Sequence, residues 1–265
     1  MAMMKNITIG QYIPGESIVH QLDPRTKILA TFLFIALLFL VETFTGYALG
    51  ALMLFVIVLL SRIPVKFVLR GIRPLMFIIV LTLCLHFFMT EGRVILQIWF
   101  LKLTYEGLIR GLMMVSRLIL LIIGSSLLTL TTSPILLTDG IESLLKPFRA
   151  VGVPAHELAM MMTIALRFIP TLVEETEKIM KAQMARGADF ESGNIFHRAK
   201  SLIPILIPLF VSAFRRADEL AVAMEARGYR GGEGRTRFRV LKFTRRDAAA
   251  LILVAGLVIL VGFCF

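Results

Sequence analysis

Cysteine is scarce in this sequence, and its two residues, Cys84 and Cys264, both lie in apolar runs. This number and placement argue against a disulfide framework and against a cysteine-based metal centre. We expect both to be packing residues, because a free cysteine behaves as a small hydrophobic side chain. The histidines do not change this conclusion. His156 and His197 lie far apart, and His86 stands in an apolar run that favours a satisfied buried histidine over a ligand, so no metal site is expected.

The sequence also lacks a nucleotide-binding loop. The glycine string GYRGGEG, residues 228–234, has neither the Gly-Lys-Ser/Thr ending nor the preceding strand that a phosphate-binding loop requires. It is typical of a flexible basic linker. The chain is therefore not expected to use ATP by itself, and no cofactor is expected.

Apolar residues, by contrast, are in excess. They make up 57% of the chain, and the mean hydropathy is +0.83. A soluble domain is about 45–50% apolar, so this composition predicts an integral membrane protein. The first 27 residues contain no early apolar core and no small-residue cleavage site, so they do not predict a signal peptide.

Five apolar runs predict membrane-spanning helices, for which about 20 mostly apolar residues are needed. They cover residues 28–41, 44–60, 75–89, 112–130 and 248–265, and a sixth or seventh span stays open. The break ETFTG predicts a tight external hairpin between the first two runs. The sequence SRIPVKFVLRGIRP predicts an interfacial helix, because apolar residues recur at helical spacing at Val65, Val68, Leu69 and Ile72. Residues 91–110 are mixed and are expected to be interfacial or re-entrant. The predicted fold class is thus an all-α, polytopic membrane protein.

The region between residues 132 and 247 has a different character, because it holds 18 of the 29 Lys and Arg residues. Its apolar stretches, 158–173 and 201–214, are interrupted by Arg167, Pro170, Pro204 and Pro208. We expect amphipathic helices that lie on or dip into the inner membrane face. The predicted organisation has three parts: four spans in 1–132, a cytoplasmic coupling domain in 133–246 and a last span in 247–265.

The net charge of +11 is interpreted as a sign of topology rather than of nucleic-acid binding. Lys and Arg collect on the cytoplasmic side of membrane proteins. A cytoplasmic N-terminus and an external C-terminus leave only Arg93, Lys102 and Arg110 outside among the basic residues of the loops and span ends. This asymmetry supports the five-span arrangement.

Two alternative classes need polar groups that the predicted spans do not supply. An intramembrane protease or lipid-modifying enzyme needs convergent catalytic groups, but the spans offer only scattered Ser, Thr, His86 and Arg117. A self-contained secondary carrier would need acidic residues within the spans, and these occur only at span edges. Arg117 either faces the protein interior or extends to the outer surface, since an arginine at the bilayer centre costs about 2.5–3.5 kcal/mol.

A short helix ending occurs twice, 41 residues apart. The segment KAQMARG ends in Ala185, Arg186 and Gly187, and AVAMEARG ends in Ala226, Arg227 and Gly228. In each copy the glycine predicts a left-handed cap, and the arginine suits the helix dipole. An ordinary capped helix would suffice to explain either copy alone. Two similar arginine tips instead favour a pair of similar carboxylate-lined pockets, because the guanidinium is a planar five-donor fork.

Three segments together resemble the T component of energy-coupling factor transporters, the EcfT/CbiQ family. They are HQLDPRTKIL at 20–29, the block at 137–190 and AMEARGYRG at 223–231. The resemblance covers nearly the whole chain and implies a non-catalytic scaffold in a bacterial or archaeal cell membrane. It implies that the two Ala-Arg-Gly ends bind two ABC-type ATPases. It also implies a partner S component that captures a vitamin or metal ion. Met160, Met161 and Met162 are either ordinary packing residues or the contact with that S component.

The topology can be tested with reporter tags at residue 192 and after Phe265. We expect the two tags to report opposite sides of the membrane, with residue 192 cytoplasmic, because of the 18 basic residues around it. Two tags on the same side would contradict the five-span arrangement.

The purified chain alone is expected neither to bind nor to hydrolyse ATP, because it has no phosphate-cradling loop. Equilibrium binding of a fluorescent ATP analogue to the isolated chain is the measurement. Saturable binding at micromolar concentration would refute the expectation.

Overall fold

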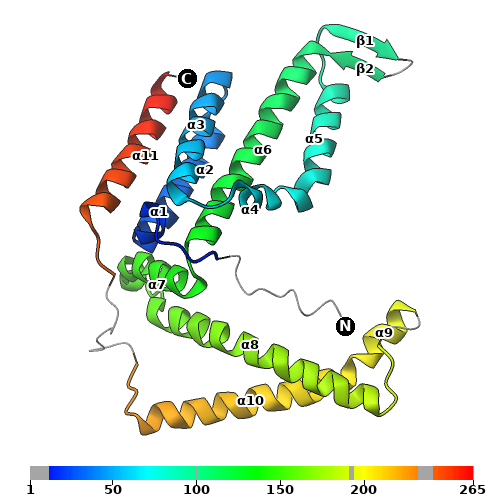
Figure 1. Ribbon diagram of the computed structural model, residues 1–265, viewed down its shortest axis with the longest axis vertical. Helices are drawn as coiled ribbons and strands as arrows, with labels where there is room; N and C mark the ends of the chain where they lie inside the picture. The colour runs from blue at the N-terminus through cyan, green and yellow to red at the C-terminus, as the bar shows by residue number, and fades with distance from the viewer. Residues whose placement is uncertain (1–11, 99–100, 191–193, 232–240, 265) are drawn as a thin grey trace. The chain divides into compact units, whose positions relative to one another are not determined.

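The computed structural model describes residues 12–98, 101–190, 194–231 and 241–264 (Figure 1). The chain divides into two compact units, one formed by residues 1–144 with 240–265 and the other by residues 145–239. Within the described ranges the fold is α-helical, as predicted, with one small hairpin. The first unit therefore contains both ends of the chain, and the second is inserted between them.

The first unit consists of helices that follow the chain from α1 to α7, together with the last helix, α11. Its helices before the hairpin are α1 (Ile18–Gln21), α2 (Pro24–Leu40), α3 (Phe44–Ser61), α4 (Val65–Arg70), η1 (Arg73–Leu75) and α5 (Met76–Met89). The hairpin and later helices are β1 (Val94–Ile98), β2 (Leu101–Thr104), α6 (Tyr105–Thr131), α7 (Pro134–Leu145, ending at the boundary) and α11 (Arg245–Cys264).

Side-chain caps mark where three helices of the first unit, α2, α3 and α6, begin. Asp23 caps α2 by accepting a hydrogen bond from the Arg25 amide at 2.9 Å, with Pro24 as the first helical residue. Thr43 and Thr104 cap α3 and α6 in the same manner. An Asp-Pro pair is typical of a helix start, and α2 begins at this pair in the sequence. The predicted break between the first two apolar runs is confirmed, since α2 ends at Leu40 and α3 begins at Phe44.

Helix α2 lies at the centre of the first unit and contacts α3, α6 and α11. Leu37 and Leu38 on α2 are fully buried and pack in one cluster with Phe34, Leu54 and Leu120. A β-carbon at Gly124 would lie only 3.0 Å from the ring of Phe34, so glycine there lets α6 approach α2 closely. Large apolar side chains also stand exposed on the outer faces, as expected of helices that contact lipid: Phe32, Phe39, Leu52, Phe55, Phe77 and Ile252.

Among the residues that the structure describes, four helical segments are long and apolar enough to cross a membrane: Phe44–Ser61, Val65–Met89, Tyr105–Thr131 and Ala155–Ala185. The first three contain predicted spans. The predicted first and last spans correspond to α2, of 17 residues, and α11, of 20 residues, which lie outside these four. The fourth is α8, whose first half is apolar, although the sequence favoured an amphipathic helix at the inner face.

The stretch predicted to be interfacial or re-entrant forms the antiparallel pair β1–β2 and the start of α6. The register pairs Val94 with Thr104 and Ile98 with Leu101, with an irregularity between Val94 and Leu96. The helix predicted from SRIPVKFVLRGIRP is present as the short α4, on which Val68 is buried and Val65 and Leu69 are exposed. Only one side of α4 therefore packs against the rest of the first unit.

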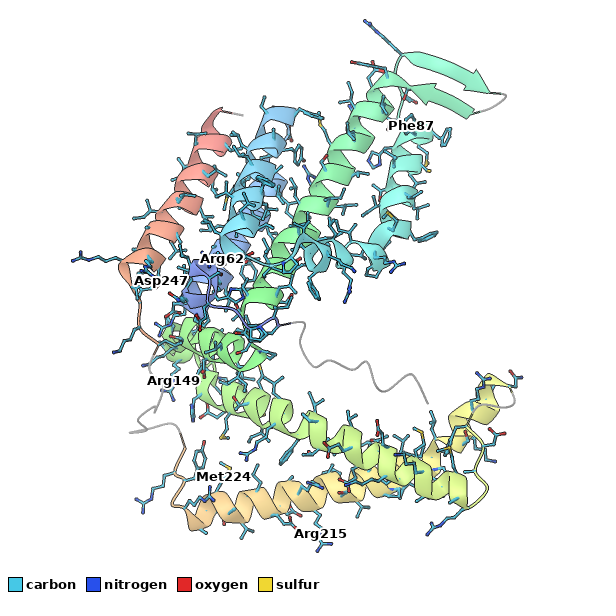
Figure 2. The ribbon with its side chains drawn as sticks, in the orientation of Figure 1. Arg62, Phe87, Arg149, Arg215, Met224 and Asp247 are labelled. Carbon is cyan, nitrogen blue, oxygen red and sulfur yellow. The ribbon has the colours of Figure 1, made fainter. Side chains whose placement is uncertain are left out.

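A buried carboxylate joins the two ends of the chain in this unit. Asp247, 1% exposed, accepts hydrogen bonds from the Asp23 amide at 2.7 Å and from the Thr244 amide at 2.8 Å. The Thr244 hydroxyl donates a further bond at 2.6 Å. The carboxylate thus holds the start of α11, where Figure 2 labels it, against the start of α2.

Lys27 completes this buried group. Its ammonium donates to the backbone oxygens of His20 and Thr131, both at 3.0 Å, and is attracted electrostatically to Asp247 and Asp23. One lysine on α2 therefore ties α1 and the end of α6 to the helix that Asp247 anchors. Burial of the Lys27 ammonium and the Asp247 carboxylate is tolerated because each is hydrogen-bonded and the two attract each other electrostatically.

Replacement of Asp247 by Ala should destabilise the first unit by at least about 2 kcal/mol, because buried donors of Asp23 and Thr244 lose their acceptor. The measurement is the thermal melting of the detergent-purified protein. Glu219→Ala is the matched control, since Glu219 forms an exposed i,i+4 pair with Arg215 that is worth little. Equal melting temperatures for the two variants would show that the Asp247 bonds contribute nothing.

Candidate functional site

The second unit is built around two long helices, α8 (Ala155–Ala185) and α10 (Ile203–Ala226), joined through α9 (Ile195–Ser201) and preceded by η2 (Lys146–Val151). Pro170, which interrupts the apolar stretch 158–173 in the sequence, does not break the helix, because α8 runs through it from Ala155. Pro208 likewise lies inside α10. A proline inside a helix removes one backbone hydrogen bond, and both helices tolerate that loss.

Glu175 is the polar centre of the contact between α8 and α10. Its carboxylate accepts a hydrogen bond from the Ser212 hydroxyl at 2.5 Å and pairs with the Arg216 guanidinium at 3.0 Å. Further along, the Gln183 side-chain amide reaches the Pro204 backbone oxygen at 3.5 Å. Because position 175 meets 212–216 while 183 meets 204, the two helices cross in opposite directions (Figure 1).

Both Ala-Arg-Gly ends fold in the same way. Arg186 has φ −88° and ψ 7°, Arg227 has φ −87° and ψ 6°, and the glycines that follow have φ +88° and +72°. The predicted left-handed caps at Gly187 and Gly228 are thus confirmed.

Two backbone hydrogen bonds close each of these turns. Gly187 donates to Met184 and Ala188 donates to Gln183, both at 3.0 Å. In the second copy Gly228 donates to Glu225 at 2.8 Å and Tyr229 donates to Met224 at 3.0 Å. This pair of bonds is the Schellman motif, which satisfies the last carbonyl groups of a helix. The repeated sequence therefore encodes a repeated backbone turn.

The turns present the two arginines to the surroundings. Arg186 and Arg227 are both exposed, and in the described part of the chain neither guanidinium has a hydrogen bond or an ion pair. No atom lies within 4 Å of where a β-carbon would stand on Gly187 or Gly228. Glycine is therefore required by the positive φ angle alone, and the tips are not packed against the rest of the unit.

The antiparallel crossing places the two tips at opposite ends of the helix pair. Arg186 follows three residues after Gln183, which meets Pro204, whereas Arg227 lies 23 residues after Pro204 along α10. At 1.5 Å per residue this is roughly 34 Å of helix. The two tips are thus two separate sites and not one.

An exposed apolar stripe on α10 was not singled out from the sequence as a binding surface. It consists of residues at helical spacing: Ile203, Leu206, Ile207, Phe210, Val211 and Phe214. The helical periodicity of residues 201–214 could have identified this stripe. Ile205, Ser212 and Arg216 lie on the opposite side of α10, where Ile205 is buried and where Ser212 and Arg216 contact Glu175 of α8. Of the three consecutive methionines near the start of α8, Met161 is 54% exposed, while Met160 and Met162 are partly buried.

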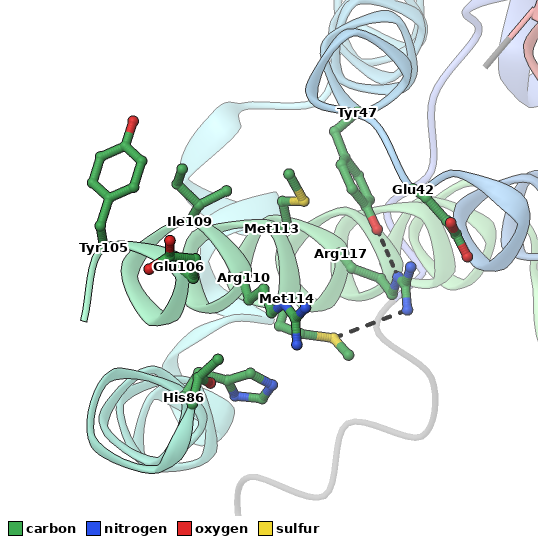
Figure 3. Close-up of a pocket in the computed structure, with 11 residues that line it drawn as sticks. Glu42, Tyr47, His86, Tyr105, Glu106, Ile109, Arg110, Met113, Met114 and Arg117 are labelled. Carbon is green, nitrogen blue, oxygen red and sulfur yellow. Dashed lines mark hydrogen bonds between the residues drawn. The ribbon is translucent and has the colours of Figure 1, made fainter. Parts of the chain in front are cut away.

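Arg117 faces the interior of the first unit, which decides between its two predicted positions. Its guanidinium donates to the Tyr47 hydroxyl at 2.9 Å (Figure 3). It also donates to the Val41 backbone oxygen at 3.0 Å. It lines an open cavity of about 660 Å³ to which the α2–α3 turn, α5 and α6 contribute residues. His86 also lines this cavity, and its ring bonds the Thr82 backbone oxygen at 2.9 Å, as expected of a satisfied histidine. The arginine therefore joins α6 to the α2–α3 turn.

Comparison with known proteins agrees with this architecture. The model of the CbiQ family, described as cobalt transport protein, matches residues 15–238. The chain is 67% identical over 249 residues to the energy-coupling factor transporter transmembrane protein EcfT of Thermosediminibacter oceani, with 94% of each chain covered. It is 52% identical over 264 residues to the protein of the same name from Bacillus subtilis, with 99% of this chain and 98% of the relative covered. The chain therefore belongs to the CbiQ family and is an EcfT-type transmembrane component of energy-coupling factor transporters.

Proposed function

We propose that this transmembrane component is a non-catalytic scaffold that couples ATP hydrolysis by two ABC-type ATPases to substrate uptake through a membrane-embedded S component. The observation that carries the proposal is the pair of matching arginine tips at opposite ends of α8 and α10. A single partner would need only one tip. Two copies of the same backbone turn, about 34 Å apart along α10, suit two copies of a similar partner.

Each tip has the chemistry of an arginine that inserts into an acidic groove. The guanidinium offers several donors in a planar fork, which matches a carboxylate in two parallel hydrogen bonds. The Schellman turn holds the arginine at the very end of a rigid helix, where it is exposed. The residues of the tips are Ala185, Arg186 and Gly187 on α8 and Ala226, Arg227 and Gly228 on α10. Binding therefore requires little rearrangement of the tip.

Coupling follows from the way in which the two helices cross. When the two ATPases close on ATP, the tips seated in them must move relative to each other. Because α8 and α10 are joined by the Glu175 contacts with Ser212 and Arg216, that displacement is transmitted along both helices. The ATPases supply the free energy, and the scaffold converts it into movement.

The S component is proposed to bind the apolar side of the same helix pair. The exposed stripe from Ile203 to Phe214 on α10 offers a contact surface, and Met161 on α8, with Met160 and Met162 beside it, adds a methionine-rich patch. Methionine side chains repack readily against different partners, which suits a scaffold that serves more than one S component. The S component, and not this chain, would select the vitamin or metal ion.

The proposed setting is the cell membrane of a bacterium or archaeon. The helix pair and both arginine tips would lie on the cytoplasmic side, with the N-terminus cytoplasmic and the C-terminus external. The 18 Lys and Arg residues between 132 and 247 support this orientation.

Charge reversal of both tips, Arg186→Glu and Arg227→Glu, should detach the ATPases and stop uptake. Loss of one partner of a buried, hydrogen-bonded charge pair costs about 2–5 kcal/mol, and reversal adds repulsion. Each single reversal should weaken assembly by roughly 30-fold or more and the double reversal should abolish it. The measurement is the copurification of ATPases with the tagged scaffold.

The matched control is Arg215→Glu, an exposed arginine of α10 whose side chain is 81% exposed and lies away from the tip. It should leave assembly unchanged. A thermal melt of the double variant should match the wild type, because the tips pack against nothing within the described residues. Full recovery of ATPases with a normal melt would show that the Ala-Arg-Gly ends serve only as helix caps.

A further inference from the structure

A second and smaller cavity lies in the first unit, between α1 and the start of α11. It has a volume of about 310 Å³ and is lined by two groups of residues: Ile18, Gln21 and Leu22 from the N-terminal side and Thr244, Arg245 and Arg246 from the start of α11. We call it the α1–α11 groove. The Arg246 guanidinium bonds the Gln21 side-chain oxygen at 3.3 Å across it, so the two sides are held together.

The groove carries positive charge that the described residues do not neutralise. Arg245 and Arg246 are both exposed, as is Lys242 just before them. The carboxylate next in sequence, Asp247, is buried and already accepts bonds from Asp23 and Thr244. Among the residues that the structure describes, Arg245 has no hydrogen bond or ion pair. Its guanidinium is therefore available to an anion.

An exposed apolar stripe continues from these arginines along α11. The stripe lies on the side of α11 that carries Arg245 and comprises Ala249, Ile252, Leu253, Gly256, Ile259 and Leu260. Ile252 is 72% exposed and Ile259 is 65% exposed, and no atom lies within 4 Å of where a β-carbon would stand on Gly256. The opposite face buries Val254 and Val261 in the core. At 1.5 Å per residue, the stripe from Arg245 to Leu260 is about 22 Å long.

We propose that the α1–α11 groove binds the phosphodiester headgroup of an anionic phospholipid whose acyl chains lie along the exposed stripe of α11. Guanidinium groups recognise phosphate oxygens through paired hydrogen bonds. Basic residues immediately beside a membrane helix bind anionic lipid, with each contributing about fivefold in affinity. A soluble phosphate would satisfy the arginines but leave the apolar stripe unused, so the stripe favours the lipid.

The proposed site shares no residue with the arginine tips or the α10 stripe that are proposed to bind the ATPases and the S component. It lies beside the Asp247 carboxylate that joins α11 to α2, so a lipid there would hold the same joint from the outside. Bound lipid should therefore raise the melting temperature of the protein without affecting the recovery of ATPases.

The test uses the full-length, delipidated protein in detergent, titrated with dioleoyl phosphatidylglycerol or with dioleoyl phosphatidylcholine and observed by native mass spectrometry. The wild type should bind phosphatidylglycerol preferentially and melt at a higher temperature in its presence. Arg245→Ala with Arg246→Ala should lose about 30-fold in affinity for phosphatidylglycerol, from about fivefold per arginine. Equal binding of the two lipids by the wild type would overturn the proposal.

The matched control is Lys66→Ala with Arg73→Ala, which removes two exposed charges from another part of the first unit. It should retain lipid binding, and equal losses in both double variants would mean that net charge alone is responsible, which overturns a defined site. Arg245→Lys with Arg246→Lys keeps the charge and should retain most of the binding even if the alanine variant folds poorly. Displacement of the lipid by millimolar glycerol 3-phosphate would overturn the lipid assignment in favour of a soluble phosphate ligand.

Discussion

The hydrogen bonds to the buried Asp247 carboxylate are the constraint on which the rest of the first unit depends. The chain leaves this unit after residue 144 and returns to it only at residue 240, so α11 needs a specific attachment to find its place. Apolar packing alone would let α11 slide or rotate on α2, because both helices are apolar on nearly every side. Because the Asp247 carboxylate accepts hydrogen bonds from Asp23 and Thr244, it fixes both the rotation of α11 about its axis and its position along α2. Lys27, close to the same carboxylate, then ties α1 and α6 to this point.

The second unit differs, because the residues of its two proposed binding tips are not packed against the rest of the unit. Arg186 and Arg227 stand exposed at helix ends, and the glycines after them meet no neighbouring atom. Such a surface can be selected for binding without conflict with packing. The two turns agree within one degree at each arginine, which is expected when the same short sequence meets the same local hydrogen-bonding demands.

Local features could be predicted from the sequence, and long-range contacts could not. The caps at Asp23, Gly187 and Gly228 depend on residues within one helical turn, so the sequence identified them correctly. The bond between Asp23 and Asp247 joins residues 224 positions apart, and that between Arg117 and Tyr47 joins residues 70 apart. No periodicity encodes such pairs. Pro170 lies inside α8, which tolerates the missing amide, so this proline does not mark a helix boundary.

The polar contact between α8 and α10 has a further consequence for the proposed coupling. Two amphipathic helices usually bury their apolar faces against each other, and this would consume the surface that a membrane partner needs. Here Glu175 receives the Ser212 hydroxyl and the Arg216 guanidinium, so one carboxylate supplies much of the specificity of the crossing. The stripe from Ile203 to Phe214 is thereby left exposed. Because a charge pair has few favourable geometries, it also keeps the crossing point fixed while the helix ends move. We infer that the polar contact at Glu175 and the exposed apolar stripe of α10 serve the same purpose. Together they let the same two helices bind partners both at their tips and along their sides.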